Sequence, residues 1–453
     1  MIETIQETDN YISSFAKVEK SRASNEQAWL TELRRSALDS FQRLGFPTTH
    51  DEEWRFTSVA PITRVPFKLA TDTGAPSAAA LKSFSFGSWS GIQLVFVNGI
   101  YSAKFSSRTR GPNGLFAGSL SEALVKHSDL LQAHLGRYAS SSEEAFAALN
   151  TAFASDGAFV YLPKGCVIER PIHLLFLSSA EKSESRVCHP RILVLAEENS
   201  QAQILESYAS LGQGVYFTNA VTELVAGENA FIDHYKLQRE SLETFHVSTI
   251  QAQLGRSANM STQSISLGAA LVRNHVNAVL AGEGGEATLN GFYLVNGRQH
   301  VDNHTSIDHA KPHCNSHELY KGILDGKARG VFNGRIIVRP DAQKTDSKQT
   351  NKNLILSEEA LVNTNPQLEI YADDVKCTHG ATIGQIAEEA LFYLRSRGIE
   401  ETAARGLLLA AFAGECLDRM KTGPARTYVE TLIAQGLKQL THASSRPHQT
   451  ARK

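Results

Sequence analysis

The spacing of apolar residues divides the chain into three parts. In residues 1–145, apolar residues recur at helical intervals between Leu30 and Phe41. In residues 146–384, short apolar strands alternate with turns rich in glycine, asparagine and acidic residues. Helical spacing returns over residues 385–453. The pattern predicts an N-terminal helical or mixed region, a β-rich core and a C-terminal helical domain with these bounds.

Glycines in the turns of the core recur at a nearly fixed interval. Gly227 and Gly255 are 28 residues apart, Gly255 and Gly282 are 27 residues apart, and Gly326 repeats the pattern after a longer interval. A nearly constant period of short strands and small turn residues predicts a parallel β-helix, in which each coil covers the next. A β-sandwich is the alternative, because strands spaced by about 8–12 residues also fit it.

The stretch 368–399 combines a strand pattern with a helix pattern. Alternation of apolar and polar residues predicts a strand on which Cys377 and His379 lie on the same face. Gly380 is expected to end this strand. The T-x-x-Q sequence that begins at Thr382 is expected to form a capping box at the start of an amphipathic helix.

The composition narrows the function classes. The chain has 453 residues, with 45 Lys plus Arg and 47 Asp plus Glu, so its formal charge is −2. This balance gives no support for bulk binding to nucleic acid or to an anionic membrane. No apolar run approaches the roughly 18 residues of a membrane helix, and the acidic N-terminus does not resemble a signal peptide. Five cysteines without a C-x-x-C pair favour a reducing compartment, the cytoplasm.

Cys377 and His379 are the first candidates for chemistry. A thiolate and an imidazole roughly 6.6 Å apart along one strand face could approach the same metal ion. Thiolates hold iron–sulfur clusters, sometimes together with imidazoles. The alternative is structural, a small buried hydrophobe and a hydrogen-bonded polar residue at the end of a solenoid. Two ligands cannot close a four-coordinate site, so a metal held here needs ligands from a partner.

A second group of candidates is rich in histidine. Its members are His300, His304, His309, His313, Cys314 and His317. Spacings of three to four would place such residues on one face of a helix, but the intervening residues have no helical pattern. The group is interpreted as polar positions along β-helix coils, with a stand-alone zinc protein as the alternative.

The sequence lacks the motifs of common enzyme classes. The glycines between Gly282 and Gly285 are not followed by the Lys and Ser/Thr of a phosphate-binding loop, and no G-x-S-x-G or H-E-x-x-H motif occurs. A carbohydrate-active β-helix enzyme is the alternative from another functional class. It would need a groove of Asp, Arg and Lys at repeated positions, which is not found. We therefore expect no enzymatic activity.

Two adjacent segments carry a resemblance to a known family. EIYADDVKCTHGAT (369–382) and LFYLRSRGI (391–399) resemble the SufB/SufD family, whose members are scaffold subunits of the SUF iron–sulfur cluster assembly system. The Lys-Cys-x-His-Gly run favours the SufD branch over the SufB branch. The resemblance extends to GFPTTHDEEWRFT (45–57) and YKGILDGKARGVFNG (320–334).

The resemblance implies a right-handed parallel β-helix flanked by helical regions. It also implies a SufBCD scaffold subunit that pairs with SufB, binds the SufC ATPase and supports iron entry and cluster assembly. ATP hydrolysis would occur in SufC. Alone, the chain would hold no tightly bound cofactor and could form a homodimer. In the complex it would hold iron or a transient iron–sulfur cluster, with Cys377 and His379 at the subunit interface.

The resemblance further implies that the C-terminal helical domain docks the ATPase subunit. The helix after residue 385 and the more apolar helix after it would provide the contact. The residues expected to make it are Ile386, Leu391, Phe392, Leu394, Leu408 and Phe412.

Overall fold

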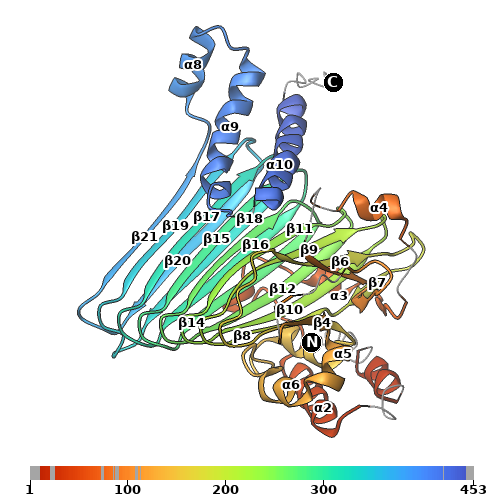
Figure 1. Ribbon diagram of the computed structural model, residues 1–453. Helices are drawn as coiled ribbons and strands as arrows, with labels where there is room; N and C mark the ends of the chain where they lie inside the picture. The colour runs from red at the N-terminus through yellow and green to blue at the C-terminus, as the bar shows by residue number, and fades with distance from the viewer. Residues whose placement is uncertain are drawn as a thin grey trace.

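The chain forms a parallel β-solenoid of about 8 turns, with helices before and after it (Figure 1). This confirms the predicted mainly β class and the parallel β-helix, and it excludes the β-sandwich. Among the described residues, no helix has both the length and the hydropathy that a membrane span requires. The structure is a computed structural model and describes residues 11–20, 26–72, 76–84, 86, 91–107, 111–112, 114–421 and 423–444.

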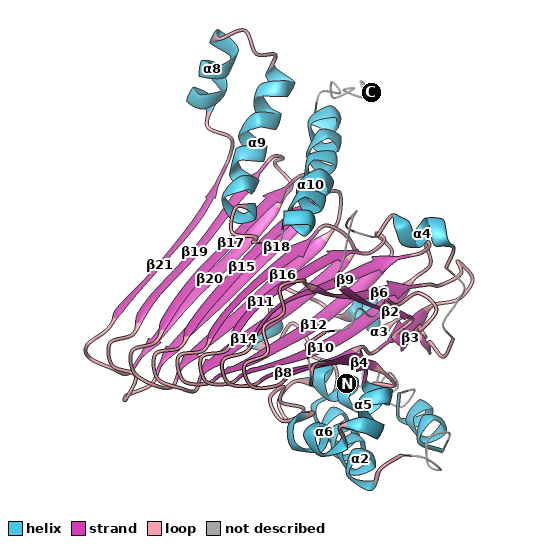
Figure 2. Cartoon of the chain, viewed as in Figure 1, coloured by secondary structure: helices cyan, strands magenta, loops and turns pink. Residues whose placement is uncertain are grey.

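Successive strands of the solenoid alternate between two sheets (Figure 2). The first sheet has, in spatial order, β20 (Leu361–Ile370), β18 (Arg329–Val338), β16 (His300–His309), β14 (Leu271–Leu280), β12 (Thr244–Leu254), β10 (Tyr216–Ala226), β8 (Arg191–Ala196), β5 (Gly157–Leu162) and β4 (Phe116–Ser119), with β1 (Lys68–Leu69) and β7 (Arg186–Cys188) beside this path. The second sheet has β21 (Lys376–Gly384), β19 (Asp346–Ile355), β17 (Asn315–Leu324), β15 (Glu286–Val295), β13 (Asn259–Ser266), β11 (Phe231–Arg239), β9 (Gln201–Ser210), β6 (Ile172–Ser178), β2 (Ile92–Val97) and β3 (Ile100–Tyr101).

Helices cover the outer faces of both sheets. On the second sheet, Leu409 and Ile433 of the C-terminal helices join Phe292 in one hydrophobic cluster. On the first sheet, Phe41 of an N-terminal helix shares a cluster with Phe217. The N-terminal elements are α2 (Ala28–Leu44), η1 (Glu52–Trp54), α3 (Ala60–Thr63), α4 (Ala78–Lys82), α5 (Leu120–Lys126), α6 (Ser128–His134) and α7 (Ala145–Phe153). The C-terminal helices are α8 (Glu388–Ser396), α9 (Glu401–Leu417) and α10 (Gly423–Ser444).

The predicted glycine repeat marks one corner of the solenoid. Gly227, Gly255 and Gly282 each follow a strand of the first sheet. A Cβ on Gly282 would lie 2.3 Å from the backbone carbon of Gly255, so successive turns stack closely there. Gly326 does not belong to this series, and its assignment to the same repeat is wrong. It follows β17 of the second sheet and stacks instead on Gly297 at the other corner.

At the corner that leads into the second sheet, one turn position per coil adopts a left-handed backbone conformation. These residues stand two positions before the strands of the second sheet, and each donates its backbone N–H to a carbonyl of the next turn. They are Asn199, Asn229, Ser257, Gly284, His313 and Lys344, with φ of 57°, 54°, 51°, 71°, 58° and 61°. The repeated conformation fixes the direction in which each coil enters the second sheet.

Inward-facing residues form rows that run across the coils. Successive coils are paired in register, so that Ile232 lies beside Met260 and Met260 beside Ala287. In the middle coils one such row is aliphatic and buried, and towards the C-terminal end it becomes polar. The row reads Ala202, Ile232, Met260, Ala287, Ser316, Ser347 and Cys377.

The left-handed turn generates a stability prediction at His313. Because a side chain with a Cβ is strained at φ 58°, His313→Gly should raise the free energy of unfolding by about 0.5–1 kcal/mol. Urea unfolding followed by circular dichroism measures the change. Asn315→Gly is the matched control: it is an exposed residue two positions later in an extended strand, where glycine should destabilise. A lower stability of His313→Gly would contradict this account of the turn.

Candidate functional site

The two ends of the solenoid differ in how their strands are paired. At the N-terminal end the sheets finish with β4 and β3, which pair antiparallel with β5 and β2. At the C-terminal end β20 pairs with β18 and β21 pairs with β19, each on one side only. Figure 1 shows β21 at the free edge of the solenoid. The outward backbone groups of β20 and β21 therefore lack a partner strand among the described residues.

The last coil also exposes large apolar side chains. Leu361 and Ile370, at the two ends of β20, are 49% and 41% exposed. Tyr371 follows directly and is 60% exposed, and Ile383 of β21 is 47% exposed. Apolar side chains gathered beside unpaired strand edges are typical of a surface that binds another protein.

Cys377 and His379 lie on the same face of β21, as the alternation predicted, and the structure shows that this is the inner face. They stand in register with two buried polar residues of β19. Cys377 is half-buried against the hydrophobic cluster around Ile336, whereas His379 is exposed. Burial and the neighbouring Asp346 carboxylate raise the pKa of the Cys377 thiol. The last coil thus presents one thiol and one imidazole at the open end of the solenoid.

The prediction that Gly380 ends this strand is wrong. β21 continues to Gly384, and its last residues pair with β19 as far as Leu354. α8 begins at Glu388 with Ala387 at its N-cap and no side-chain capping bond, so Thr382 forms no capping box. The local signals are overridden because β19 offers a continuous row of backbone hydrogen-bond partners.

Three of the residues predicted to dock the ATPase pack within the protein itself. Leu391 is buried. Ile386 and Phe412 pack against the cluster that joins α9 and α10 to the second sheet. The Lys321 ammonium lies 3.9 Å from the centre of the Phe412 ring. Ile386 and Phe412 therefore help to attach the helices to the solenoid, whereas Leu391 is buried on α8, which contacts α9.

The remaining docking candidates lie on a helical hairpin that projects from the solenoid (Figure 1). The Phe392 side chain is 74% exposed, while Leu394 and Leu408 are half-buried. Two further exposed residues were missed by sequence reasoning, namely Tyr393 at 57% and Leu407 at 53%. Phe392, Tyr393 and Leu407, here called the hairpin patch, form the exposed apolar set on α8 and α9.

The histidines of the second candidate group do not gather at one site, and only His300 and His304 share a cluster. His300 and His304 lie on the outer face of the first sheet, whereas His309 is buried inside and hydrogen-bonds Ser316. His313 occupies a turn and His317 is exposed on β17. In the part of the chain that the structure describes, no group of three or more His, Cys, Asp or Glu residues could hold a metal ion.

His300 and His304 instead belong to a buried polar cluster that links the N-terminal region to the solenoid. His304 Nδ1 lies 2.8 Å from Glu53 Oε2, and its Nε2 lies 3.2 Å from Asp302 Oδ1. Thr57 Oγ1 lies 2.8 Å from His300 Nε2 and donates to Asp302. Because the partners are about 245 residues apart, no local sequence signal could have revealed the cluster.

Asp302 is the electrostatic centre of this cluster. Its side chain is 1% exposed and pairs with the fully buried Arg273 guanidinium, which lies 4.2 Å from the centre of the Trp54 ring. Burial alone would raise the pKa of Asp302, but Arg273 and His304 hold this pKa well below its usual value. The cluster is fully engaged in attaching η1 to β14 and β16.

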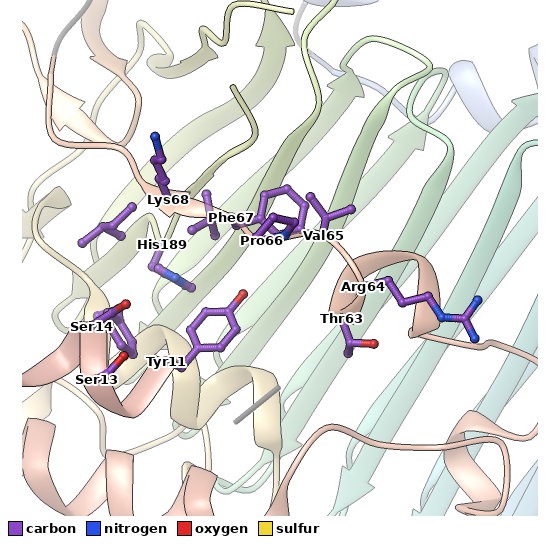
Figure 3. A pocket seen from close by; sticks show the side chains of 13 residues that line it. Tyr11, Ser13, Ser14, Thr63, Arg64, Val65, Pro66, Phe67, Lys68 and His189 are labelled. Atoms are coloured by element: carbon purple, nitrogen blue, oxygen red, sulfur yellow. The ribbon is translucent and has the colours of Figure 1, made fainter. Parts of the chain in front are cut away.

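A separate pocket of about 370 Å³ lies beside the N-terminal helical residues 11–20 (Figure 3). The Tyr11 hydroxyl points into it, near His189 and the segment that contains Pro66, while the Arg64 side chain points away from Tyr11. The Tyr11 ring packs edge-on against Phe41, and burial raises the pKa of its hydroxyl. None of the residues that line this pocket belongs to β20 or β21.

Two family descriptions match consecutive parts of the chain. The SUF system FeS cluster assembly, SufBD core domain, matches residues 176–412, and the SufBD protein N-terminal region matches residues 5–174. The two matches together span both the solenoid and the N-terminal helices.

Several curated proteins are similar over most of their length. An iron–sulfur cluster assembly SufBD family protein of Synechocystis sp. is 36% identical over 406 residues, covering 88% of this chain and 89% of the relative. The iron–sulfur cluster assembly protein SufD of Escherichia coli is 31% identical over 401 residues, covering 88% and 91%. Protein ABCI7, chloroplastic, of Arabidopsis thaliana is 28% identical over 414 residues, covering 89% and 86%.

Through Asp302, the buried cluster should make the free energy of unfolding sensitive to acid. Asp302→Asn leaves Arg273 buried without a counter-charge and should lower the free energy of unfolding at pH 7 by about 3 kcal/mol. The folded-state pKa of Asp302 lies below its unfolded value near 3.9, so its stabilisation is present above that pH and is lost as the pH falls further. Asp302→Asn should therefore flatten the loss of stability between about pH 5 and pH 2.

Urea unfolding at a series of pH values measures this. Asp308→Asn is the control, because its partner Arg339 has a side chain that is 53% exposed and such pairs contribute about 1 kcal/mol or less. If Asp302→Asn has wild-type stability at pH 7 and loses stability between about pH 5 and pH 2 as the wild type does, the electrostatic role assigned to Asp302 is contradicted.

Proposed function

The chain belongs to the SufBD family of the SUF iron–sulfur cluster assembly system, and from this membership we propose that it acts as a SufD-type scaffold subunit. In this role it pairs with SufB, carries the SufC ATPase and supports iron entry and cluster assembly. The scaffold itself catalyses no reaction, holds no tightly bound cofactor when alone and works in the cytoplasm.

The observation that carries this proposal is the unpaired last coil. β20 and β21 leave their outward backbone groups without a strand partner and expose Leu361, Ile370 and Ile383 beside them. The end of a second solenoid of similar cross-section would pair both edges at once and cover these side chains. SufB, as the family relative, is the partner we propose. A second copy of this chain could take the same place when SufB is absent.

The thiol and imidazole of the last coil would then lie inside the joined interface. Cys377 and His379 supply two donors for iron or for a forming cluster, which is the cargo of the assembly. A four-coordinate iron requires further ligands, and the facing surface of SufB would provide them. Closure of the interface would also exclude water from the donors and keep the cargo between the two subunits.

The hairpin patch on α8 and α9 is the proposed contact for SufC. An apolar set that projects away from the solenoid can be covered by a partner without unfolding the core. Nucleotide-driven movement of the ATPase would then act on the helices directly connected to β21. Such a link would let ATP hydrolysis in SufC change the interface that holds Cys377 and His379.

The docking proposal generates a prediction at Phe392. Because its side chain is 74% exposed, Phe392→Asp should leave the fold intact while placing an unpaired charge in the contact with SufC. Pull-down of SufC by the variant should fall at least tenfold. Val125→Asp is the control, since Val125 is 86% exposed on α5, far along the chain from the hairpin. Undiminished recovery of SufC by Phe392→Asp would remove the hairpin patch as the docking surface.

The proposed role of the last coil is tested at His379. His379→Ala should sharply reduce the yield of iron–sulfur cluster in the reconstituted SufBCD-type complex. Its melting midpoint should stay close to that of the wild type, because the side chain is exposed. Thr378→Ala, on the opposite face of β21, is the matched control and should be nearly silent. Cys377→Ser should have an intermediate effect, because a thiolate of the partner subunit can provide part of the ligation.

Cluster absorbance and the melting midpoint are recorded together for each variant. Full cluster yield from His379→Ala would refute the role proposed for this residue. A collapsed midpoint with loss of the complex would instead assign the pair to the structure of the last coil.

A further inference from the structure

Two rows of inward-facing polar residues lead from inside the solenoid to Cys377 and His379. They run along the second sheet over the last three coils, where the register pairs β17 with β19 and β19 with β21. The first row reads Glu318, Gln349 and His379, and the second reads Ser316, Ser347 and Cys377. In the preceding coil the residues at these two positions are the apolar Leu289 and Ala287. In the second row the change from apolar to polar residues therefore occurs only near the open end, whereas in the first row Leu289 separates Glu318 from the buried polar residues Thr262 and His234 of the middle coils.

In the first row, the hydrogen bond between Gln349 and Glu318 leaves the Gln349 oxygen available for His379. Gln349 Nε2 donates to Glu318 Oε2 at 2.8 Å, and the two residues are only 1% and 3% exposed. In this orientation the amide nitrogen is the donor, and the amide oxygen remains as an acceptor. The Gln349 Oε1 atom is buried and accepts no hydrogen bond from any described residue. The next residue in register is His379, whose ring can supply the missing donor.

The second row is a chain of hydroxyl groups behind Cys377. His309 Nε2 lies 2.9 Å from Ser316 Oγ, and Ser316 Oγ lies 2.7 Å from Ser347 Oγ. Ser347 is 1% exposed and stands in register with Cys377. Each member of the Cys377–His379 pair therefore has a buried polar neighbour, and each neighbour is held by a further buried group.

We propose that Gln349 and Ser347 are positioning residues for His379 and Cys377. Glu318 and Ser316 hold them in place from one coil deeper, and Ser316 is in turn hydrogen-bonded to His309. This inference rests on the proposed function of the pair as ligands for iron or a forming cluster. In the assembled complex, Gln349 Oε1 would accept a hydrogen bond from one ring N–H of His379, a bond that the isolated chain does not form. The lone pair of the other ring nitrogen is then fixed and available for the metal.

The surroundings of Glu318 suit this role. Burial raises the pKa of Glu318 to about 7, and the groups beside its carboxyl are the neutral side chains of Thr305 and Gln349. The carboxyl keeps an oxygen that accepts from Gln349 whether or not it carries a proton. The support given to His379 therefore depends on an acceptor at this position and not on a negative charge.

Cobalt(II) is the probe for the test, because a cobalt–thiolate absorption band reports on the ligands directly. The assembled complex with SufB and SufC is titrated with cobalt(II) for the wild type and for Gln349→Leu. Loss of a hydrogen bond to a ligating histidine lowers metal affinity by about 10–100-fold. We expect a loss of this size for Gln349→Leu and for Glu318→Leu. Glu318→Gln keeps an acceptor and should restore an affinity close to that of the wild type.

Each outcome of the titration decides the inference. Weaker binding by His379→Ala with unchanged binding by Gln349→Leu overturns the inference and leaves the proposed function standing. Equal affinity for wild type and His379→Ala refutes the proposed role of His379 and the inference with it. If Gln349→Leu does not fold, the comparison of Glu318→Leu with Glu318→Gln replaces it. Equal affinities for those two variants would also overturn the inference.

Discussion

The backbone hydrogen bonds of a solenoid can be satisfied only from coil to coil, so each end of the stack needs a cover. In this protein the N-terminal end is finished by β3 and β4, which run antiparallel to their neighbours. The C-terminal end has no such strand in the described chain, and β20 and β21 remain edges. This asymmetry between the ends makes the last coil the place where a second protein can join the fold.

The same coil-to-coil pairing determines which side chains reach that place. Because the register is kept across every coil, an inward residue of β17 has its successors in β19 and β21 directly beside it. Rows that are aliphatic in the middle of the solenoid supply its stability. Over the last three coils, from Ser316 and Glu318 onward, two rows are polar and are proposed to support Cys377 and His379. The residues that stabilise the solenoid and the residues proposed to bind iron thus lie at different positions along the same interior.

Part of this arrangement could be predicted from the sequence. The spacing of Gly227, Gly255 and Gly282 revealed the coil length, because successive turns stack closely at this corner. Alternation along residues 368–379 was sufficient to place Cys377 and His379 on one face. Both signals are local, and they depend on the size and polarity of neighbouring residues.

Other features depend on the register, which local patterns do not contain. The strand continues past Gly380 because β19 provides backbone partners, and Gly326 lies at the opposite corner from the other glycines. The left-handed turn positions are filled by residues as different as Asn199, Ser257 and Lys344, so they have no common signature. Glu318 and Gln349 are 31 residues apart and meet only because one coil has that length.

The most direct test of the account is hydrogen exchange of the last coil, measured with and without SufB. The account predicts that backbone amides within residues 361–370 and 376–384 exchange markedly more slowly in the complex, because a partner strand pairs the two edges. Amides of β3 and β4, at the opposite end, should exchange as they do in the isolated chain. Unchanged exchange across both β20 and β21 in a complex that has formed would contradict the central claim.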